Sequence, residues 1–276
     1  GPGPFPALVL SHGAGRSARY NLAHEASAFA AAGIAALVYD KPGLGLSSDG
    51  NWFMLSIAEQ ARIVAAAADT LERRSDVSSV GAWGFSQGGW VVPRAAERSD
   101  AIDLLVLASG AAVPPQEQAD QAMRARMDAA GMPDSAVASA RAHMSEVWRR
   151  VNRGLPPDSF ADLDARADSA PWGRFVRRIQ LQFQVAWWRA NELDTGAALR
   201  AISVPVLALY GSEDRNVPPA ENVPRMIHLL AAAPTRDVTV WVLPDADHQF
   251  RSGDDYQPLY FRSMTEWVRH RTGEPD

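Results

Sequence analysis

The sequence predicts an α/β protein in which a mostly parallel sheet is flanked by helices, and two observations lead to this fold class. The first is that short apolar runs alternate with longer amphipathic or Ala-rich segments; the runs lie at residues 7–11, 34–39, 77–85, 104–108, 204–210 and 238–243. Such alternation is typical of βαβ units, whose parallel sheet is covered on both faces. The second is that the alternation stops after Gly110 and resumes near residue 204, so a long segment interrupts a single sheet.

The longer segments between the apolar runs are predicted as helices that cover the sheet. They lie at residues 18–32, 56–73, 87–97 and 219–232, and a final helix is expected at residues 256–270. Residues 111–200 contain no strand-like run and are predicted as a helical cap inserted after the fourth strand. We therefore expect residues 1–110 and 201–276 to form the core and residues 111–200 to fold over it.

Aromatic side chains are abundant in the predicted cap, which contains four tryptophans and three phenylalanines. Most of these rings are expected to form the cap's own core and its seat on the sheet domain. Trp187 and Trp188 are the candidates for contact with a substrate.

Composition limits the classes of function. The chain has 276 residues, 47% hydrophobic and 21% charged, and a net charge of −5 without a block of like charges, so no nucleic-acid partner is expected. The absence of cysteine excludes disulfides, thiolate metal sites and a cysteine nucleophile. Lys41 is the only lysine among 27 basic residues. No apolar run approaches the roughly 18 residues that span a bilayer, so no membrane partner is expected and the cytoplasm is the expected compartment.

The pentapeptide Gly84-Phe85-Ser86-Gln87-Gly88 is the strongest chemical signal, because a predicted strand precedes it and a predicted helix follows it. A serine on a sharp strand-to-helix turn exposes its hydroxyl, and flanking glycines let neighbouring segments approach closely. The hydroxyl is too weakly acidic to attack a carbonyl unaided at neutral pH. It needs a base, and the base needs an acid that orients it.

Candidates for both partners follow later strands of the predicted sheet. Asp214 lies just past the strand that resumes the alternation, and His248 lies just past the last strand. Loops at the carboxyl ends of parallel strands share one edge of the sheet, so Ser86, Asp214 and His248 can converge. Asp245 and Asp247 compete with Asp214 because they neighbour His248. Asp214 is preferred, since a loop from a different strand can approach the imidazole squarely.

Taken together, these motifs resemble the α/β-hydrolase superfamily, and more narrowly its bacterial serine esterases with a helical cap. The order Ser, Asp, His is the one expected of that superfamily. Two further loops match: Ser11-His12-Gly13-Ala14-Gly15 after the first strand, and Asp40 to Ser47 after the second, which is similar to the family's Asp-x-x-Gly-x-Gly-x-Ser loop.

The resemblance implies roles for several residues. Backbone N–H groups of Ala14 and Gln87 are expected to form the oxyanion hole, and Gly13 is expected to leave room for the substrate. His12 is expected to hold its loop through hydrogen bonds rather than act as the base. Asp40 is expected to brace the turn at Gly43 to Gly45.

The chain departs from the family in one respect. The superfamily commonly has two further strands before the one that leads to the His-Gly loop, and residues 1–6 leave no room for them. The first one or two family strands are therefore expected to be absent: either the sheet is trimmed, or upstream residues are missing, or a partner covers the exposed edge.

The sequence thus predicts a serine hydrolase that cleaves a carboxylic ester through an acyl-enzyme, with a small-molecule acyl substrate and no metal or cofactor. A thioesterase, amidase, peptidase or acyltransferase would use the same three residues. Epoxide hydrolases and haloalkane dehalogenases fit less well, because their nucleophile is an aspartate. A non-catalytic receptor of the same fold is a further alternative, although a binding pocket has no need of all three residues. The oligomeric state and the substrate are left open.

Overall fold

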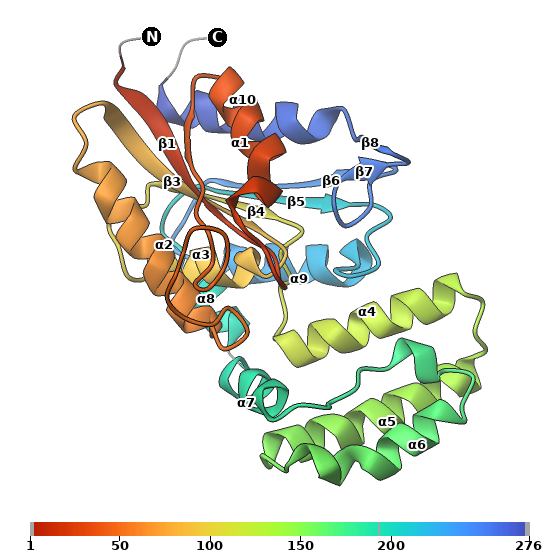
Figure 1. Ribbon diagram of the computed structural model, residues 1–276. Coiled ribbons are helices and arrows are strands. Elements are labelled where there is room, and N and C mark those ends of the chain that lie inside the picture. The colour runs from red at the N-terminus through yellow and green to blue at the C-terminus, as the bar shows by residue number, and fades with distance from the viewer. Residues whose placement is uncertain (1–2, 193, 274–276) are drawn as a thin grey trace.

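Six strands form one parallel sheet in the computed structural model, which describes residues 3–192 and 194–273 (Figure 1). The strands are β1 (Phe5–Ser11), β2 (Ala35–Leu37), β3 (Val77–Phe85), β4 (Leu104–Ala108), β5 (Val206–Gly211) and β6 (Val238–Leu243). Their order is β2-β1-β3-β4-β5-β6, and every neighbouring pair is parallel. This confirms the predicted fold class. The lack of one or two family strands stays a prediction.

Helices cover both faces of the sheet. One face carries α1 (Ala23–Ala31), preceded by the 3₁₀ turn η1 (Arg19–Leu22), together with α10 (Leu259–Thr272). The other face carries α2 (Ile57–Glu72), α3 (Gly88–Ala96), α8 (Thr195–Arg200) and α9 (Pro219–Ala231). Strand side chains alternate between these two apolar layers, which explains why the strands read as nearly continuous apolar runs.

The last helix begins later than the sequence predicts. Tyr256 belongs to a small antiparallel hairpin, β7 (Arg251–Ser252) and β8 (Asp255–Tyr256), and α10 starts only at Leu259. Strands of two residues are too short to leave an alternating pattern, so the sequence could not indicate this hairpin.

Between β4 and β5 the described residues form helices and no strand, and four α-helices precede α8 there. They are α4 (Pro115–Ala129), α5 (Asp134–Asn152), α6 (Ala161–Asp168) and α7 (Gln182–Ala190), with the 3₁₀ turns η2 (Pro157–Phe160) and η3 (Gly173–Phe175). Figure 1 shows them as a separate group beyond the carboxyl ends of the strands. We call α4 to α7, together with the segments that join them, the inserted helices. They bury an apolar core of their own that includes Met127, Trp148, Phe160 and Trp172.

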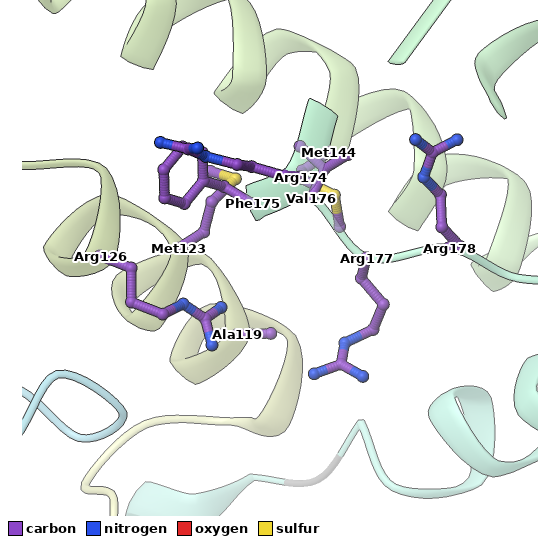
Figure 2. Close-up of a pocket in the computed structure, with 9 residues that line it drawn as sticks. All are labelled: Ala119, Met123, Arg126, Met144, Arg174, Phe175, Val176, Arg177 and Arg178. Atoms are coloured by element: carbon purple, nitrogen blue, oxygen red, sulfur yellow. The ribbon is translucent and has the colours of Figure 1, made fainter. Parts of the chain in front are cut away.

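A cavity of about 520 Å³ lies within the inserted helices (Figure 2). It is lined by α4, by Met144 of α5 and by the segment from Arg174 to Arg178. Four arginine side chains also line it.

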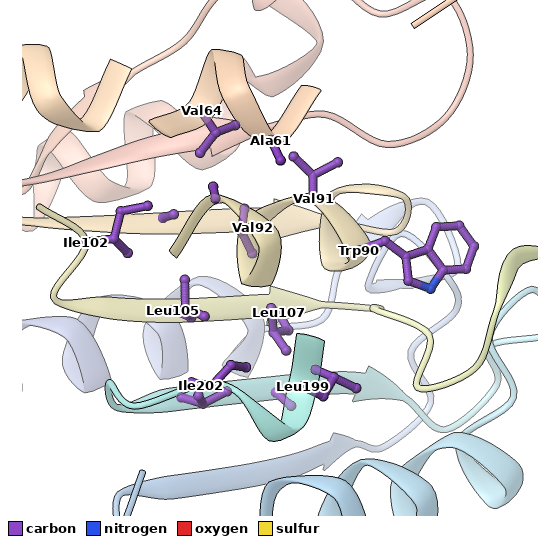
Figure 3. Close-up of a cluster of buried hydrophobic side chains, with 14 of the residues drawn as sticks. Ala61, Val64, Trp90, Val91, Val92, Ile102, Leu105, Leu107, Leu199 and Ile202 are labelled. Carbon is purple, nitrogen blue, oxygen red and sulfur yellow. The ribbon is translucent and has the colours of Figure 1, made fainter. Parts of the chain in front are cut away.

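Helix α3 lies at the centre of the larger apolar layer, which fixes the position of its first turn (Figure 3). Val91 and Val92 are fully buried and pack between α2 and the sheet strand that carries Leu105 and Leu107. Each such side chain contributes about 1.5–3 kcal/mol by leaving water. Because α3 begins at Gly88, this packing also holds the turn that precedes it.

No helix within residues 3–192 and 194–273 combines the length and the apolar composition needed to cross a bilayer.

Candidate active site

Ser86 occupies a tight turn between β3 and α3. Its φ is +51°, in the left-handed region that residues other than glycine rarely adopt, and its N–H donates to the Ala108 carbonyl oxygen at 2.8 Å. The neighbouring glycines are required by close packing: a Cβ on Gly84 would lie 2.4 Å from the Gly88 oxygen, and a Cβ on Gly88 would lie 2.7 Å from the Ser11 oxygen. The turn therefore holds Ser86 in a strained but well-defined position.

The structure brings Ser86, His248 and Asp214 into one hydrogen-bonded series. His248 Nε2 lies 3.0 Å from Ser86 Oγ, and His248 Nδ1 lies 2.8 Å from Asp214 Oδ2. A carboxylate only accepts hydrogen bonds, so Nδ1 carries the proton and Nε2 presents its lone pair to the serine hydroxyl. The imidazole is thus oriented to accept a proton from Ser86.

Asp214 is held on its other side by the backbone. Its side chain has no solvent-accessible surface, and its Oδ1 accepts hydrogen bonds from Asn216 N–H and Val217 N–H, both at 2.8 Å. Two main-chain donors leave the second oxygen free for the imidazole. The carboxylate therefore has one defined orientation.

Asp245 and Asp247, the alternatives to Asp214, form no hydrogen bond with the His248 ring. Asp247 Oδ1 accepts from Gln249 N–H at 2.8 Å and Arg251 N–H at 2.9 Å, and so stabilises the turn after the histidine. Asp245 is exposed, with φ +56°, and its N–H donates to Ser212 Oγ at 2.9 Å. Only Asp214 of the three reaches His248, and it comes from a different strand.

Sequence reasoning missed Ser109, which positions the histidine loop. Ser109 follows β4 with φ +50°, and its hydroxyl donates to the His248 carbonyl oxygen at 3.0 Å. The Phe85 ring packs against the imidazole, with ring centroids 5.2 Å apart. A lone serine after a strand has no pattern that would have indicated this role.

The proposed oxyanion donors lie beside Ser86. Gln87 N–H and Ala14 N–H have no hydrogen-bond acceptor among the described residues. Gln87 is buried and precedes the first turn of α3, whose N-terminus favours negative charge. A Cβ on Gly13 would lie 3.0 Å from the Phe85 ring and 3.5 Å from Ser86 Cβ, so the two loops approach closely. One unpaired N–H group thus belongs to the residue after Ser86, and the other belongs to the residue after Gly13.

Lys41 is a further residue of the site that the sequence did not assign. Its ammonium donates to the Gly13 carbonyl oxygen at 2.7 Å and to the Gly15 carbonyl oxygen at 3.2 Å. The side chain is buried, and burial lowers the pKa of Lys41 to about 8. Lys41 thus fixes the positions of the carbonyl groups of Gly13 and Gly15, on both sides of Ala14. Its status as the chain's only lysine was the available signal.

The structure does not show the hydrogen bonds through which His12 was expected to hold its loop. The ring is fully buried and packs edge-on against Tyr39, but neither ring nitrogen has a hydrogen-bond partner of normal geometry. Burial, followed by the Lys41 charge, lowers the pKa of His12 to about 4. His12 therefore supports its loop by packing as a neutral ring, not through hydrogen bonds.

Asp40 braces the turn at Gly43 to Gly45, as expected. Its carboxylate accepts from Leu46 N–H and Arg19 N–H, at 2.9 and 2.8 Å, and occupies the space that a Cβ on Gly45 would need. It braces the turn and lies outside the series of Ser86, His248 and Asp214.

A cavity of about 410 Å³ opens in front of the oxyanion loop. Its lining includes Ala14 and Gln87 together with Trp187 and Trp188, the two candidate rings of the inserted helices. Trp187 Nε1 donates to the Leu55 carbonyl oxygen at 3.1 Å, which ties α7 to the loop before α2. The walls also include residues that the sequence did not single out as a group: Trp52, Phe53, Trp90, Phe183 and Arg177.

A family described as serine aminopeptidase, S33, matches residues 3–254, which is most of the chain. The protein is an α/β-hydrolase. The match and the parallel sheet together place it among the serine hydrolases of that fold.

Curated proteins similar to this α/β-hydrolase include esterase EstD of Thermotoga maritima, which is 24% identical over 92% of this chain and 57% of its own length. A putative carboxymethylenebutenolidase of Escherichia coli is 27% identical over 52% of this chain and 58% of its own length. The chain therefore spans somewhat more than half the length of these relatives. Among solved structures, the monoacylglycerol lipase of Paleococcus ferrophilus aligns with a TM-score of 0.61 and 23% identity, covering 98% of this chain and 96% of the lipase.

Proposed function

We propose that this α/β-hydrolase cleaves carboxylic esters through an acyl-enzyme, with Ser86 as nucleophile, His248 as general base and Asp214 as the orienting acid. The observation that supports the proposal most directly is the series of hydrogen bonds from Ser86 Oγ through the imidazole to a buried carboxylate. A serine with that partner order is the arrangement that acyl transfer requires.

In the first half of the reaction Ser86 Oγ attacks the ester carbonyl carbon while His248 Nε2 takes the hydroxyl proton. The carbonyl oxygen becomes negatively charged, and the N–H groups of Ala14 and Gln87 stabilise that charge. One such donor is worth about 3–4 kcal/mol in comparable sites. The carbon–oxygen bond of the ester then breaks, and the imidazolium returns its proton to the departing alcohol.

In the second half a water molecule attacks the acyl-enzyme. His248 Nε2 takes a proton from the water, and a second tetrahedral species forms at the same carbon. Collapse of that species releases the carboxylic acid, and the proton on His248 returns to Ser86 Oγ. Asp214 stabilises the imidazolium in both halves, because its buried carboxylate lies 2.8 Å from Nδ1.

We also propose that residues 111–200 act as a cap over a core formed by residues 1–110 and 201–276. Support comes from the inserted helices, which contribute Trp187, Trp188 and Arg177 to the cavity that begins at Ala14 and Gln87. The cap would select the substrate, and the core would supply the chemistry.

Charge in the cavity favours an ester over the peptide that the family's description names. An aminopeptidase must bind the ammonium group of its substrate, and carboxylates are the side chains that do so. The described residues that line this cavity include Lys41 and Arg177 but no aspartate or glutamate. A cationic substrate end would be repelled there.

The proposal is tested by Ser86→Ala. We expect this variant to lose turnover of 4-nitrophenyl butyrate almost completely, by at least about 10⁴-fold, while its circular dichroism and melting temperature match the wild type. Ser145→Ala is the matched control, because Ser145 is exposed on α5 and its hydroxyl bonds only to the Arg141 carbonyl oxygen. A fluorophosphonate probe should label the wild type and Ser145→Ala but not Ser86→Ala. Turnover retained by Ser86→Ala, or labelling elsewhere, would overturn the assignment.

The bond type is tested by matched substrates that share an acyl group. Butyrate esters, thioesters and amides, together with an aminoacyl 4-nitroanilide, are compared by kcat/KM on the purified protein. We expect the ester to be fastest and the aminoacyl substrate slowest, since the cavity carries positive charge.

A further inference from the structure

The cavity within the inserted helices is surrounded by four arginines that differ in their partners. Arg178 donates to Asp164 and Asp168 and is therefore neutralised. The Arg174 guanidinium stacks on the Phe175 ring, 4.8 Å from its centroid. Arg126 and Arg177 have neither a hydrogen bond nor an ion pair to any described residue. Arg174 likewise has no hydrogen bond or ion pair to a described residue, so three of the four guanidinium groups keep their hydrogen-bonding capacity, and their directions distinguish them.

Arg126 and Arg177 also face each other. Figure 2 shows both guanidinium groups on one side of the cavity, with Ala119 between them, whereas Arg174 and Arg178 extend away. Both residues are exposed to solvent, and the surrounding protein acts on the Arg177 charge. That surrounding protein, followed by the Arg126 charge, lowers the pKa of Arg177. Two like charges held close without a counter-ion cost free energy, and a bound anion would remove that cost.

Arg177 connects this cavity with the one in front of Ser86. It lines both cavities, and its guanidinium lies over the Trp188 ring, 5.2 Å from the centroid. No aspartate or glutamate lines either cavity within the described chain, although the protein as a whole has a net charge of −5. The positive charge is therefore a local property of these two cavities, one of which is also lined by Ala14 and Gln87.

We propose that Arg177, assisted by Arg126, binds an anionic carboxylate or phosphate group of the substrate while the ester carbonyl lies at Ser86. The inference rests on the ester hydrolysis proposed above and narrows its substrate class to esters that carry a second, negatively charged group. A planar guanidinium matches such oxygen pairs with two parallel hydrogen bonds. The aromatic walls between the two ends suit an apolar spacer.

Two pairs of esters test the proposal, one for each half of the substrate. The first pair is the 4-nitrophenyl monoester of suberic acid, with a free carboxylate, and 4-nitrophenyl octanoate. The second is the butyrate ester of 4-hydroxybenzoate and that of 4-hydroxybenzamide. In the wild type we expect kcat/KM to be higher for the charged member of at least one pair. In Arg177→Met we expect that charged-to-neutral ratio to fall by at least about tenfold, since hydrogen bonds to charged groups are worth that much.

Arg174→Met is the matched control, because it removes the same charge from the same segment but from a side chain that extends away. Its ratio should stay within about twofold of the wild type, while Arg126→Met should lower the ratio less than Arg177→Met does. Sodium chloride at 0.5 M should reduce the wild-type preference, as expected for partly exposed charges. Competitive inhibition by octanoate and by octyl phosphate then tells which anionic group fits better.

The proposal is overturned if the wild type prefers neither charged ester, if Arg177→Met keeps the preference, or if Arg174→Met loses it equally. Hydrolysis of the neutral esters without a charge preference would leave ester hydrolysis intact and refute only the arginine site. If no ester is hydrolysed, the function proposed above fails, and calorimetry still tests the site separately. Monomethyl suberate should then bind Ser86→Ala at least tenfold more tightly than Ser86→Ala/Arg177→Met, and equal binding would refute the site.

Discussion

The sheet edge that carries Ser86 and the inserted helices beyond it differ in how their polar groups are paired. At the sheet edge, Asp214 has three hydrogen-bond donors and the His248 loop is anchored through Ser109 and Asp247. In the inserted helices, Arg126 and Arg177 face a cavity with no acidic partner among the described residues. The reacting side chains of the first region are paired with one another, whereas the second region contains two arginines without a hydrogen-bonding partner in the described chain.

This difference separates chemistry from selection. Acyl transfer needs a fixed geometry, and the side chains of Ser86, His248 and Asp214 are each hydrogen-bonded to a neighbour. Recognition of a substrate needs unpaired groups, and the inserted helices contribute Arg177 to the lining of the cavity. Mutations in the first region should therefore change kcat for every ester, and mutations in the second should change which ester is preferred.

The largest effect that tests the comparison is expected for Asp214→Asn. The amide still accepts from Asn216 N–H and Val217 N–H, but its amide nitrogen faces His248 Nδ1 and favours the wrong tautomer. We expect kcat to fall by about 10⁴-fold, as for comparable triads. Asp247→Asn keeps its acceptor for the turn, so kcat should change by less than about threefold. Equal losses in the two variants, measured with 4-nitrophenyl butyrate, would argue against Asp214 as the orienting acid.

The second expectation concerns the stability of the sheet edge in acid. His12 stays neutral in the folded state down to its pKa of about 4, whereas in the unfolded chain it gains a proton below about 6.5. Its folded pKa is depressed, so stability is lost as the pH falls from about 6.5 to about 4, by about 3 kcal/mol. His12→Phe keeps a ring without an ionisable group. Urea unfolding at pH 7 and pH 4 should show a loss about 3 kcal/mol larger in the wild type, and parallel losses would contradict the assignment.

A third, smaller effect is expected for Lys41→Met, which removes both hydrogen bonds to the Gly13 and Gly15 carbonyls. The Ala14 N–H then loses its fixed direction, and we expect kcat to fall about 10-fold to 100-fold, somewhat less than for loss of an oxyanion donor itself. Because a buried ammonium is costly, thermal stability should stay equal or rise. A merely structural role would instead lower the melting temperature and leave kcat per folded molecule unchanged, so the two readouts separate the cases.

The smallest effects concern the junction between the two regions. Asn222 of α9 is fully buried; it donates to Gln121 of α4 at 2.9 Å and accepts from Ala112 N–H at 2.9 Å. We expect Asn222→Ala to cost about 2 kcal/mol in urea unfolding, because it leaves buried groups unpaired. The partly exposed pair of Arg124 and Glu221 joins the same helices at 2.6 Å, and Arg124→Met should cost less than about 1 kcal/mol. A larger loss for Arg124→Met than for Asn222→Ala would mean that surface charge, not the buried amide, joins the regions.

Much of the sheet edge could be predicted because its chemistry depends on short local patterns. The turn from Gly84 to Gly88 must be compact, because a strand leads directly into a helix there. Only residues without a side chain fit at its two ends, so five consecutive residues show the requirement. The choice of Asp214 over Asp245 and Asp247 followed from the rule that parallel strands end at one edge. The hydrogen bond at 2.8 Å agrees with that choice.

Other residues could not be predicted because nothing local distinguishes them. Ser109 acts through a carbonyl oxygen 139 residues away in the chain, and Lys41 reaches a loop 26 to 28 residues away. His12 was expected to form hydrogen bonds, but its burial beside Tyr39 leaves both ring nitrogens unpaired. Such contacts depend on how loops from separate strands pack.

The sequence by itself determined the alternation of strands and helices, the turn at Ser86, and the order of the three residues that meet there, because local sterics and apolar periodicity control each of them. Only the tertiary structure decided which of 27 basic side chains stand unpaired beside the cavity. The reason is physical: a backbone turn depends on its immediate neighbours, whereas the pairing of a long charged side chain depends on what the rest of the fold places within its reach.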